Sequence, residues 1–108
     1  MASIISSIVD AGSPGFDGAV MPDHYMWGTR NWGMSLDDYI TLETWITLTY
    51  LVAKTDKIRL GTLVTPIPFR PPSILAKMIS TLDILSKGRV VFGVGAGWSQ
   101  PEFEGYSV

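Results

Sequence analysis

The sequence has no cysteine and a single histidine, and both features limit the chemistry of its side chains. Without cysteine the chain forms no disulfide and offers no thiolate to a metal ion. A lone histidine also argues against a zinc site built from imidazole ligands. We therefore expect a protein whose function needs no bound metal.

Long apolar runs and an excess of basic charge are also missing. No run approaches the roughly 20 apolar residues of a membrane-spanning helix. Residues 4–9 are too short and too interrupted for a signal-peptide core, and no basic residue precedes them. The formal net charge is -2, whereas a nucleic-acid surface needs a basic face. We therefore expect a cytoplasmic protein that binds neither nucleic acid nor membrane.

The sequence does contain an alternation of helical and extended patterns over 108 residues, a length that suits one modest domain. Apolar residues at helical spacing, together with capping and turn residues, predict helices over residues 1–12, 36–53 and 71–85. Short apolar runs ended by proline or glycine predict strands over residues 16–21, 58–65 and 90–94. After Trp98 we expect a loop with one short turn around Glu102.

Strict alternation of helix and strand implies parallel strands joined by right-handed crossovers. Two architectures fit this order, an open doubly wound sheet and part of a (β/α)8 barrel. Three strands are few for an independent parallel sheet, and both outer strands would be exposed edges. The pattern therefore indicates an α/β unit that belongs to something larger.

The stretch from residue 86 to residue 98 combines a helix end, an apolar run and three glycines. Gly88 suits the left-handed position just past a helix. The apolar run 90–94 predicts a strand covered on both faces, and the glycines that follow allow a ligand to approach the backbone. The spacing Gly-x-Gly-x-Gly differs from the dinucleotide fingerprint Gly-x-Gly-x-x-Gly, which disfavours a Rossmann site. A flavodoxin-like nucleotide binder would need a helix after Gly97.

Four groups of residues together carry a resemblance to a known family. They are Gly15-Phe16-Asp17 with Asp23-His24; Glu43-Thr44-Trp45 with Thr55 and residues 58–66; Arg70-Pro71-Pro72 with residues 75–77 and 81–83; and residues 86–98 with Glu102. In order and spacing they resemble the luciferase-like monooxygenase superfamily, in particular its deazaflavin (coenzyme F420)-dependent branch. The resemblance implies a partial TIM (β/α)8 barrel, from helix 1 to strand 4, formed by residues 1–108. Because a complete barrel needs roughly 250 residues, it implies an N-terminal fragment.

The resemblance also implies an oxidoreductase site at the carboxyl ends of the strands. The cofactor would be coenzyme F420 as first choice, or FMN, and the reaction hydride transfer to, or monooxygenation of, a small organic substrate. His24 is implied as the catalytic residue facing the cofactor ring, since imidazole can donate a hydrogen bond or proton near neutral pH. Without the resemblance, a lone histidine here would be a surface or structural residue. Asp23 is expected to orient the loop or the histidine through a hydrogen bond.

Other residues are implied to shape the same site. Val64 and Thr65 would form a bulge with a non-proline cis peptide behind the ring, although a plain strand end before Pro66 is the alternative. The backbone of residues 95–97, Gly95, Ala96 and Gly97, would pass close to the cofactor. Trp27 and Trp98 would wall the substrate pocket, although Trp98 could instead pack in the core against Trp27 or Trp45.

Where sugar-phosphate dehydrogenases of the family carry a catalytic acid, this sequence has Trp98, which places that substrate class in doubt. Arg70, at a strand end, could meet an anion. Arg89 precedes its strand and is expected to be structural, pairing with Asp83. For Glu102, a helix-start or loop-anchor role is weighed equally with a catalytic one.

Barrels commonly hold the cofactor phosphate with the loops after strands 7 and 8. A chain that ends at strand 4 is therefore expected to bind a flavin-type cofactor poorly and to be inactive alone. The alternative function is a non-catalytic barrel remnant or an oligomerisation module, which would bury its open edges against a second copy. A homo-oligomer is expected in either case.

Overall fold

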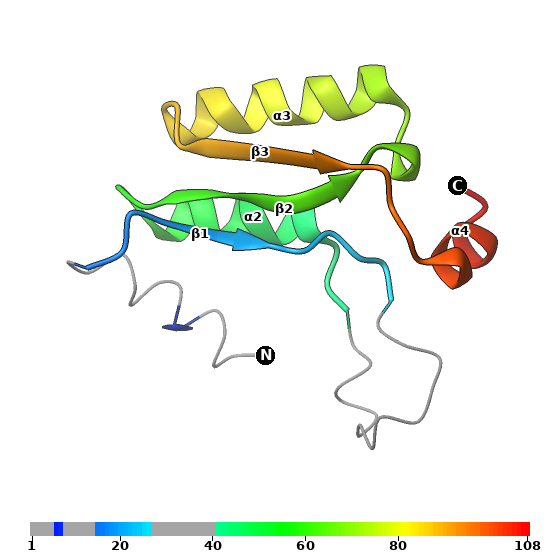
Figure 1. Cartoon of the computed structure of the whole chain (residues 1–108). Helices are drawn as coiled ribbons and strands as arrows, with labels where there is room; N and C mark the ends of the chain where they lie inside the picture. The colour runs from blue at the N-terminus through cyan, green and yellow to red at the C-terminus, as the bar shows by residue number, and fades with distance from the viewer. Residues whose placement is uncertain (1–5, 8–14, 27–40) are drawn as a thin grey trace.

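The computed structural model describes residues 6–7, 15–26 and 41–108. Their elements in chain order are β1 (Gly18–Met21), α2 (Thr44–Lys54), β2 (Arg59–Pro66), the 3-10 turn η2 (Ile67–Phe69), α3 (Pro72–Ser86), β3 (Val90–Gly95) and α4 (Gln100–Tyr106) (Figure 1). The three predicted strands and the third predicted helix are confirmed to within two residues at each end. Most of the helix expected over residues 1–12 lies outside the described residues.

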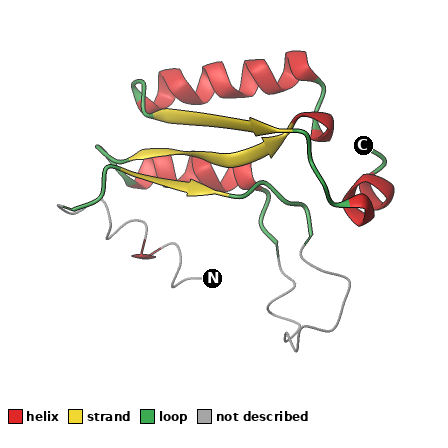
Figure 2. Ribbon diagram, in the orientation of Figure 1, coloured by secondary structure: helices red, strands yellow, loops and turns green. Residues whose placement is uncertain are grey.

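The described strands form one parallel sheet in the order β1-β2-β3 (Figure 2). Leu60 in the central strand is aligned with Ala19 on one side and Val90 on the other. Strands that are neighbours in the sheet also follow one another along the chain: α2 connects β1 to β2, and α3 connects β2 to β3. The sheet is therefore built from consecutive β-α-β units, as the alternation of patterns predicted.

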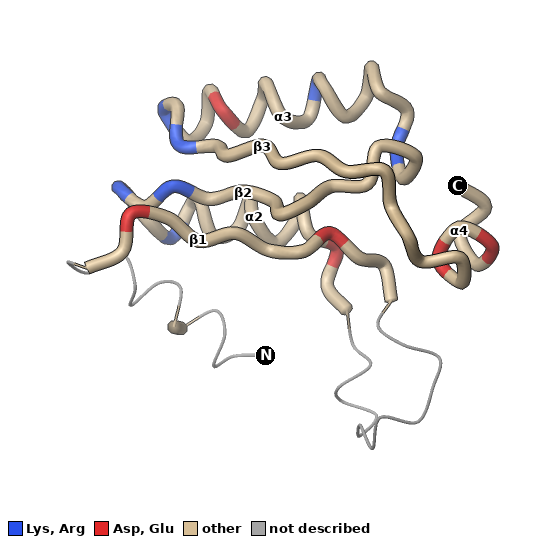
Figure 3. Tube along the Cα trace, viewed as in Figure 1, with Lys and Arg blue, Asp and Glu red and all other residues tan. Residues whose placement is uncertain are grey.

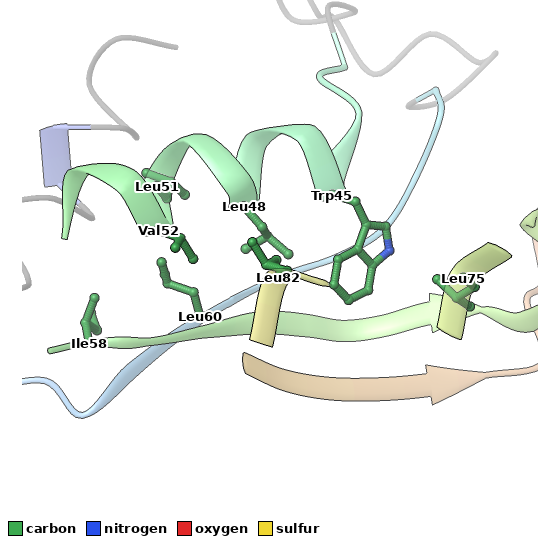
Figure 4. Close-up of a cluster of buried hydrophobic side chains, with 8 residues drawn as sticks. All are labelled: Trp45, Leu48, Leu51, Val52, Ile58, Leu60, Leu75 and Leu82. Carbon is green, nitrogen blue, oxygen red and sulfur yellow. The ribbon is translucent and has the colours of Figure 1, made fainter. Parts of the chain in front are cut away.

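The core lies between the sheet and the two connecting helices (Figure 4). Its buried side chains come from α2, β2, α3 and the approach to β2: Trp45, Leu48, Leu51, Val52, Ile58, Leu60, Leu75 and Leu82. Ala19, Met21 and Val90 pack against this cluster from the same side of the sheet. Both helices therefore cover one face of the sheet, and burial of their apolar stripes is the main source of stability.

No described segment covers the opposite face of the sheet, so the prediction of a strand covered on both faces is wrong for the described part of the chain. Val20, Leu63 and Val91, which point away from the helices, are all exposed. β3 is an edge strand of the described sheet, and its Phe92 and Val94 are also partly exposed. A continuous apolar run indicates that a strand can be buried on both faces, but it does not record which segments cover it.

The structure differs from the prediction in the start of one helix and in the presence of another. Residues 41–43 are not helical, so the helix expected from Leu36 begins at Thr44. Glu43 is its N-cap, and its Oε2 accepts from the backbone N–H of Ile46 at 2.7 Å. A short helix, α4, replaces the loop expected after Trp98. Its start carries an overlooked signal, Ser99 followed three residues later by Glu102, with a proline in the first turn.

The end of α3 is as expected from Gly88, which has φ +81°. Its N–H donates to the Asp83 carbonyl at 2.9 Å, closing the helix. Arg89 is structural, as predicted, but it does not use Asp83. Its guanidinium donates to Thr55 Oγ1 and to the backbone carbonyls of Val52, Ile58 and Ser86. Within the described residues, no helix is both long and apolar enough to cross a bilayer.

Candidate active site

A pocket of about 330 Å³ lies where the three strands end. Its lining residues come from the loop after β1, the end of β2, η2, and the segment from β3 to α4: Pro22, His24, Leu63, Val64, Pro66, Phe69, Gly95, Ala96, Gly97, Trp98, Ser99 and Glu102. The carboxyl ends of parallel strands are where α/β enzymes place their sites. The structure thus brings together six of the predicted site residues, His24, Val64, Gly95, Ala96, Gly97 and Trp98.

The remaining predicted residues are placed differently. Asp23 and Thr65 are buried beside the pocket without lining it. Trp27 lies outside the described residues. Among the described residues, no group of three or more histidine, aspartate or glutamate side chains is arranged to hold a metal ion.

His24 is held at the pocket by a buried acid. Its Nδ1 lies 2.7 Å from Glu102 Oε2, and the side chains are 12% and 0% exposed respectively. The other oxygen, Oε1, accepts from the backbone N–H groups of Tyr25 at 2.6 Å and Met26 at 3.2 Å. Glu102 therefore ties the loop after β1 to α4, which is the loop-anchor arrangement, one of the roles weighed for it from the sequence.

These contacts also set the charge of Glu102. Burial raises the pKa of its carboxyl, but hydrogen bonds from His24, from the backbone of Met26 and Tyr25, and from Ser99 outweigh burial. The pKa is therefore below its ordinary value of 4.5. Glu102 is a carboxylate at neutral pH, and it can only accept hydrogen bonds.

Asp23 anchors the same loop from the other side. Arg70 donates to it with both arms of the guanidinium, Nη1 to Oδ2 at 2.6 Å and Nη2 to Oδ1 at 3.0 Å. Nη2 also contacts Glu43 Oε1. Burial lowers the pKa of Arg70, but hydrogen bonds and charge interactions with Asp23 and Glu43 raise it above its ordinary value. Arg70 thus meets anions, as predicted, but they are carboxylates of its own chain, and Asp23 orients the loop.

Tyr25 locks the loop by aromatic contacts that were not predicted. Its ring stacks on Phe69 with a centroid distance of 4.6 Å and lies 4.7 Å from Tyr106. Arg70 lies over the same ring at 5.2 Å, and the hydroxyl donates to the Phe69 carbonyl. Burial, as the main cause, raises the pKa of Tyr25. The described part of the loop that carries His24 is therefore held on either side of the histidine, at Asp23 and at Tyr25.

The end of β2 forms the back wall of the pocket. The pairing with β3 shifts between Thr62 and Thr65, which is the expected bulge. The non-proline cis peptide joins Leu63 to Val64, one residue earlier than the predicted Val64–Thr65 position. Thr65 itself is fully buried. Thr65 is therefore not among the residues that line the pocket.

The glycines of β3 are explained by this bulge. A Cβ at Gly93 would lie 2.4 Å from the Thr62 carbonyl oxygen, and one at Gly95 would lie 2.7 Å from Val64 Cγ2. They let β3 approach the irregular end of β2, so the crowding neighbour is a strand and not only a ligand.

Trp98 forms an exposed side of the pocket. Its side chain is 77% exposed, and its ring centre lies 5.5 Å from that of His24 at an interplanar angle of 70°. Packing of Trp98 in the core is therefore wrong. Trp45 instead contacts Phe92, with ring centres 5.9 Å apart.

The charges near the pocket bear on what it can hold. In the described part of the chain, none of its lining residues is a lysine or an arginine, and Arg70 is already paired. Most basic residues lie at the other end of the sheet, where β2 and β3 begin (Figure 3). Among the described lining residues, the ionisable side chains are therefore His24 and Glu102.

Comparison with known proteins finds relatives that share this sequence pattern and this fold. The sequence model of one family, described as luciferase-like monooxygenase, matches residues 2–108. A 68-residue stretch is 46% identical to an uncharacterized protein of Mycobacterium tuberculosis, covering 63% of this chain and 24% of that protein. A 63-residue stretch is 40% identical to a pyrimidine monooxygenase of Pseudomonas savastanoi, covering 58% and 17%. The chain thus spans a quarter or less of these curated relatives.

Solved structures show the same fold. The oxygenating constituent of 3,6-diketocamphane monooxygenase from Pseudomonas putida, in complex with FMN, superposes with a TM-score of 0.77 at 22% identity, over 99% of this chain and 27% of that one. The coenzyme F420-dependent tetrahydromethanopterin reductase of Methanopyrus kandleri gives a TM-score of 0.71 at 28% identity, over 100% and 27%. With the family match, this decides against a flavodoxin-like nucleotide binder, although α4 does follow Gly97.

Proposed function

The chain belongs to the luciferase-like monooxygenase family, and we propose that its sheet is one arc of a (β/α)8 barrel whose pocket holds the ring of a flavin-type cofactor. Three features support the barrel: all described strands are parallel, both connecting helices cover one face, and the other face is apolar and open. In a closed barrel that open face is the interior.

The observation that carries the proposed site is the placement of His24. A buried carboxylate holds its ring at the pocket, beside the exposed face of Trp98. Leu63, Val64 and Phe69 supply apolar surface for a flat ring, and His24 supplies the one ionisable group with a basic nitrogen. Through its other ring nitrogen, Nε2, His24 then accepts a hydrogen bond from the polar edge of the ring, or gives a proton to it when the imidazole is protonated, and Trp98 limits the exposure of the ring to water.

The cofactor we propose is coenzyme F420 as first choice, or FMN. When bound, the deazaflavin supplies hydride transfer, and reduced FMN with oxygen supplies monooxygenation of a small organic substrate. The relatives include proteins described with either cofactor. Because the described lining residues include no lysine or arginine to meet a phosphate, we expect this chain to bind the cofactor weakly and to show no turnover alone.

The test compares ligands that share a ring and differ in phosphate. The chain is titrated with FMN, riboflavin and coenzyme F420, followed by ligand absorbance and fluorescence. We expect weak binding, and we expect the Kd of riboflavin to lie within about threefold of the Kd of FMN. These two ligands differ by one phosphate, and a larger ratio would require charge contacts to that phosphate, which the described lining residues do not supply. Trp98→Ala should weaken riboflavin binding. Ile46→Ala should leave binding unchanged, because Ile46 is 72% exposed and lies outside the pocket. Absence of binding by any ligand at millimolar concentration would sink the proposal.

The open face of the sheet favours a second candidate, an oligomerisation module. Val20, Leu63 and Val91 expose apolar surface on this face, and burial against a second copy would remove it from water. Size-exclusion chromatography with light scattering tests this candidate. A homo-oligomer that dissociates when Val91 is replaced by Lys supports it, and a stable monomer at high micromolar concentration contradicts it.

A further inference from the structure

Glu102 is completely buried although it lies on a short helix at the edge of the fold. A buried carboxylate is unfavourable unless hydrogen bonds replace the water that it loses. Here the replacements are divided between the two oxygens. Oε1 faces two backbone N–H groups, and Oε2 faces the Nδ1 of His24. The Ser99 side chain also hydrogen-bonds to this carboxylate.

This division fixes the proton on the His24 ring. Because a carboxylate only accepts, Nδ1 must be the donor, and the neutral ring carries its lone pair on Nε2. The ring nitrogen that exchanges a proton with a ligand is then Nε2.

We propose that Glu102 is the positioning residue of the site: it sets the tautomer of His24 and offsets the charge of the ring when His24 is protonated. Glu102 acts through His24 and not on the ligand. The tautomer follows from the contacts alone, whereas its use toward a ring ligand rests on the proposed function.

Replacement of Glu102 by glutamine separates this role from simple anchoring of the loop. Two backbone N–H groups face Oε1, so the amide oxygen takes that place and keeps the loop. The amide NH₂ then occupies the place of Oε2 and donates toward His24. Nδ1 must accept, and the neutral ring must move its proton to Nε2. A purely structural role predicts no such change.

Long-range proton–nitrogen NMR of the labelled chain reads the tautomer directly. The sequence has one histidine, so the ring signals need no assignment. At mildly alkaline pH we expect the Nδ1–H form in the native chain and mainly the Nε2–H form in Glu102→Gln. Glu104→Gln, an exposed position on the same helix that pairs with Gln100, is the matched control and should leave the ring unchanged.

A native spectrum dominated by the Nε2–H form would overturn the proposal, and this outcome does not depend on whether any variant folds. A folded Glu102→Gln chain that keeps the Nδ1–H form would also overturn it.

Titration with riboflavin, the phosphate-free ring, then tests the link to function. We expect Glu102→Gln and His24→Ala each to weaken binding by about tenfold, the loss of one good hydrogen bond. The double variant should be no weaker than His24→Ala, because Glu102 acts through the histidine. Additive losses would contradict the positioning role. If riboflavin binds no form of the chain, the proposed function fails while the NMR result still decides the tautomer.

Discussion

Replacement of Arg70 by methionine should remove the ion-pair network that joins β1, η2 and α2. Arg70 is held by two hydrogen bonds to Asp23, whose side chain is 0% exposed, and by one contact to Glu43. Methionine keeps most of the apolar length of arginine without its charge. The substitution therefore leaves the Asp23 carboxylate buried without its cation.

The expected loss can be worked from these contacts. Removing one partner of a buried ion pair costs about 3–5 kcal/mol. The contact with the more exposed Glu43 adds up to about 1 kcal/mol, and the guanidinium over Tyr25 about 0.5–1 kcal/mol. Because Arg70 is not fully buried, we take the lower part of this range and expect a loss of about 4 kcal/mol. A domain of this size has a total stability of about 5–15 kcal/mol.

Urea unfolding, followed by circular dichroism, measures this loss. Arg59→Met is the matched control: Arg59 is exposed, and we expect a change within about 0.5 kcal/mol. Adding Asp23→Asn to Arg70→Met should restore part of the stability, because a neutral unpaired amide costs only about 1–3 kcal/mol. A loss below about 1 kcal/mol for Arg70→Met would refute the argument, since it would mean that Asp23 needs no cation in the folded state.

Three further predictions use the same unfolding assay. Gly61→Ala should destabilise by about 1–3 kcal/mol or more, because the new Cβ would lie 1.7 Å from the Val91 carbonyl oxygen; wild-type stability would show that the strands can separate there. Leu48→Ala should lose about 2–5 kcal/mol, whereas the exposed Ile46→Ala should change little; equal losses would contradict the core. The folded pKa of Glu102 is lowered, so its contribution is present above pH 4.5 and lost as the pH falls through the folded value. Below pH 4.5 the free energy of unfolding should therefore fall more steeply with decreasing pH in the native chain than in Glu102→Gln. Parallel plots of this free energy against pH for the two chains would contradict the prediction.

Much of the fold was predictable because its signals are local. The three strands, α3 and the left-handed position of Gly88 all follow from periodicity and turn residues within about ten positions along the chain. The predicted start of α2 at residue 36 was wrong: the helix begins at Thr44, and its N-cap is Glu43, a residue type that is not among the preferred N-caps. The Ser99-to-Glu102 spacing carried a local signal for α4 that was not used.

The pocket was only partly predictable. His24, Trp98 and residues 95–97 each follow a predicted strand, and parallel strands bring their carboxyl ends to one edge. The resemblance to a family supplied their expected roles. The glycines of residues 93–95 were correctly judged special, but their crowding by β2 was not foreseen, since it depends on the bulge at the end of that strand.

By itself the sequence determined the alternation of helices and strands, the absence of cysteine chemistry, and the residues that follow each strand. Only the tertiary structure decided which of these residues act on one another. Glu102 contacts His24 across 78 residues of chain, and Arg70 contacts Asp23 across 47. A buried charge selects its partner by the position of the chain in space, where desolvation makes pairing necessary, and no local pattern records that choice.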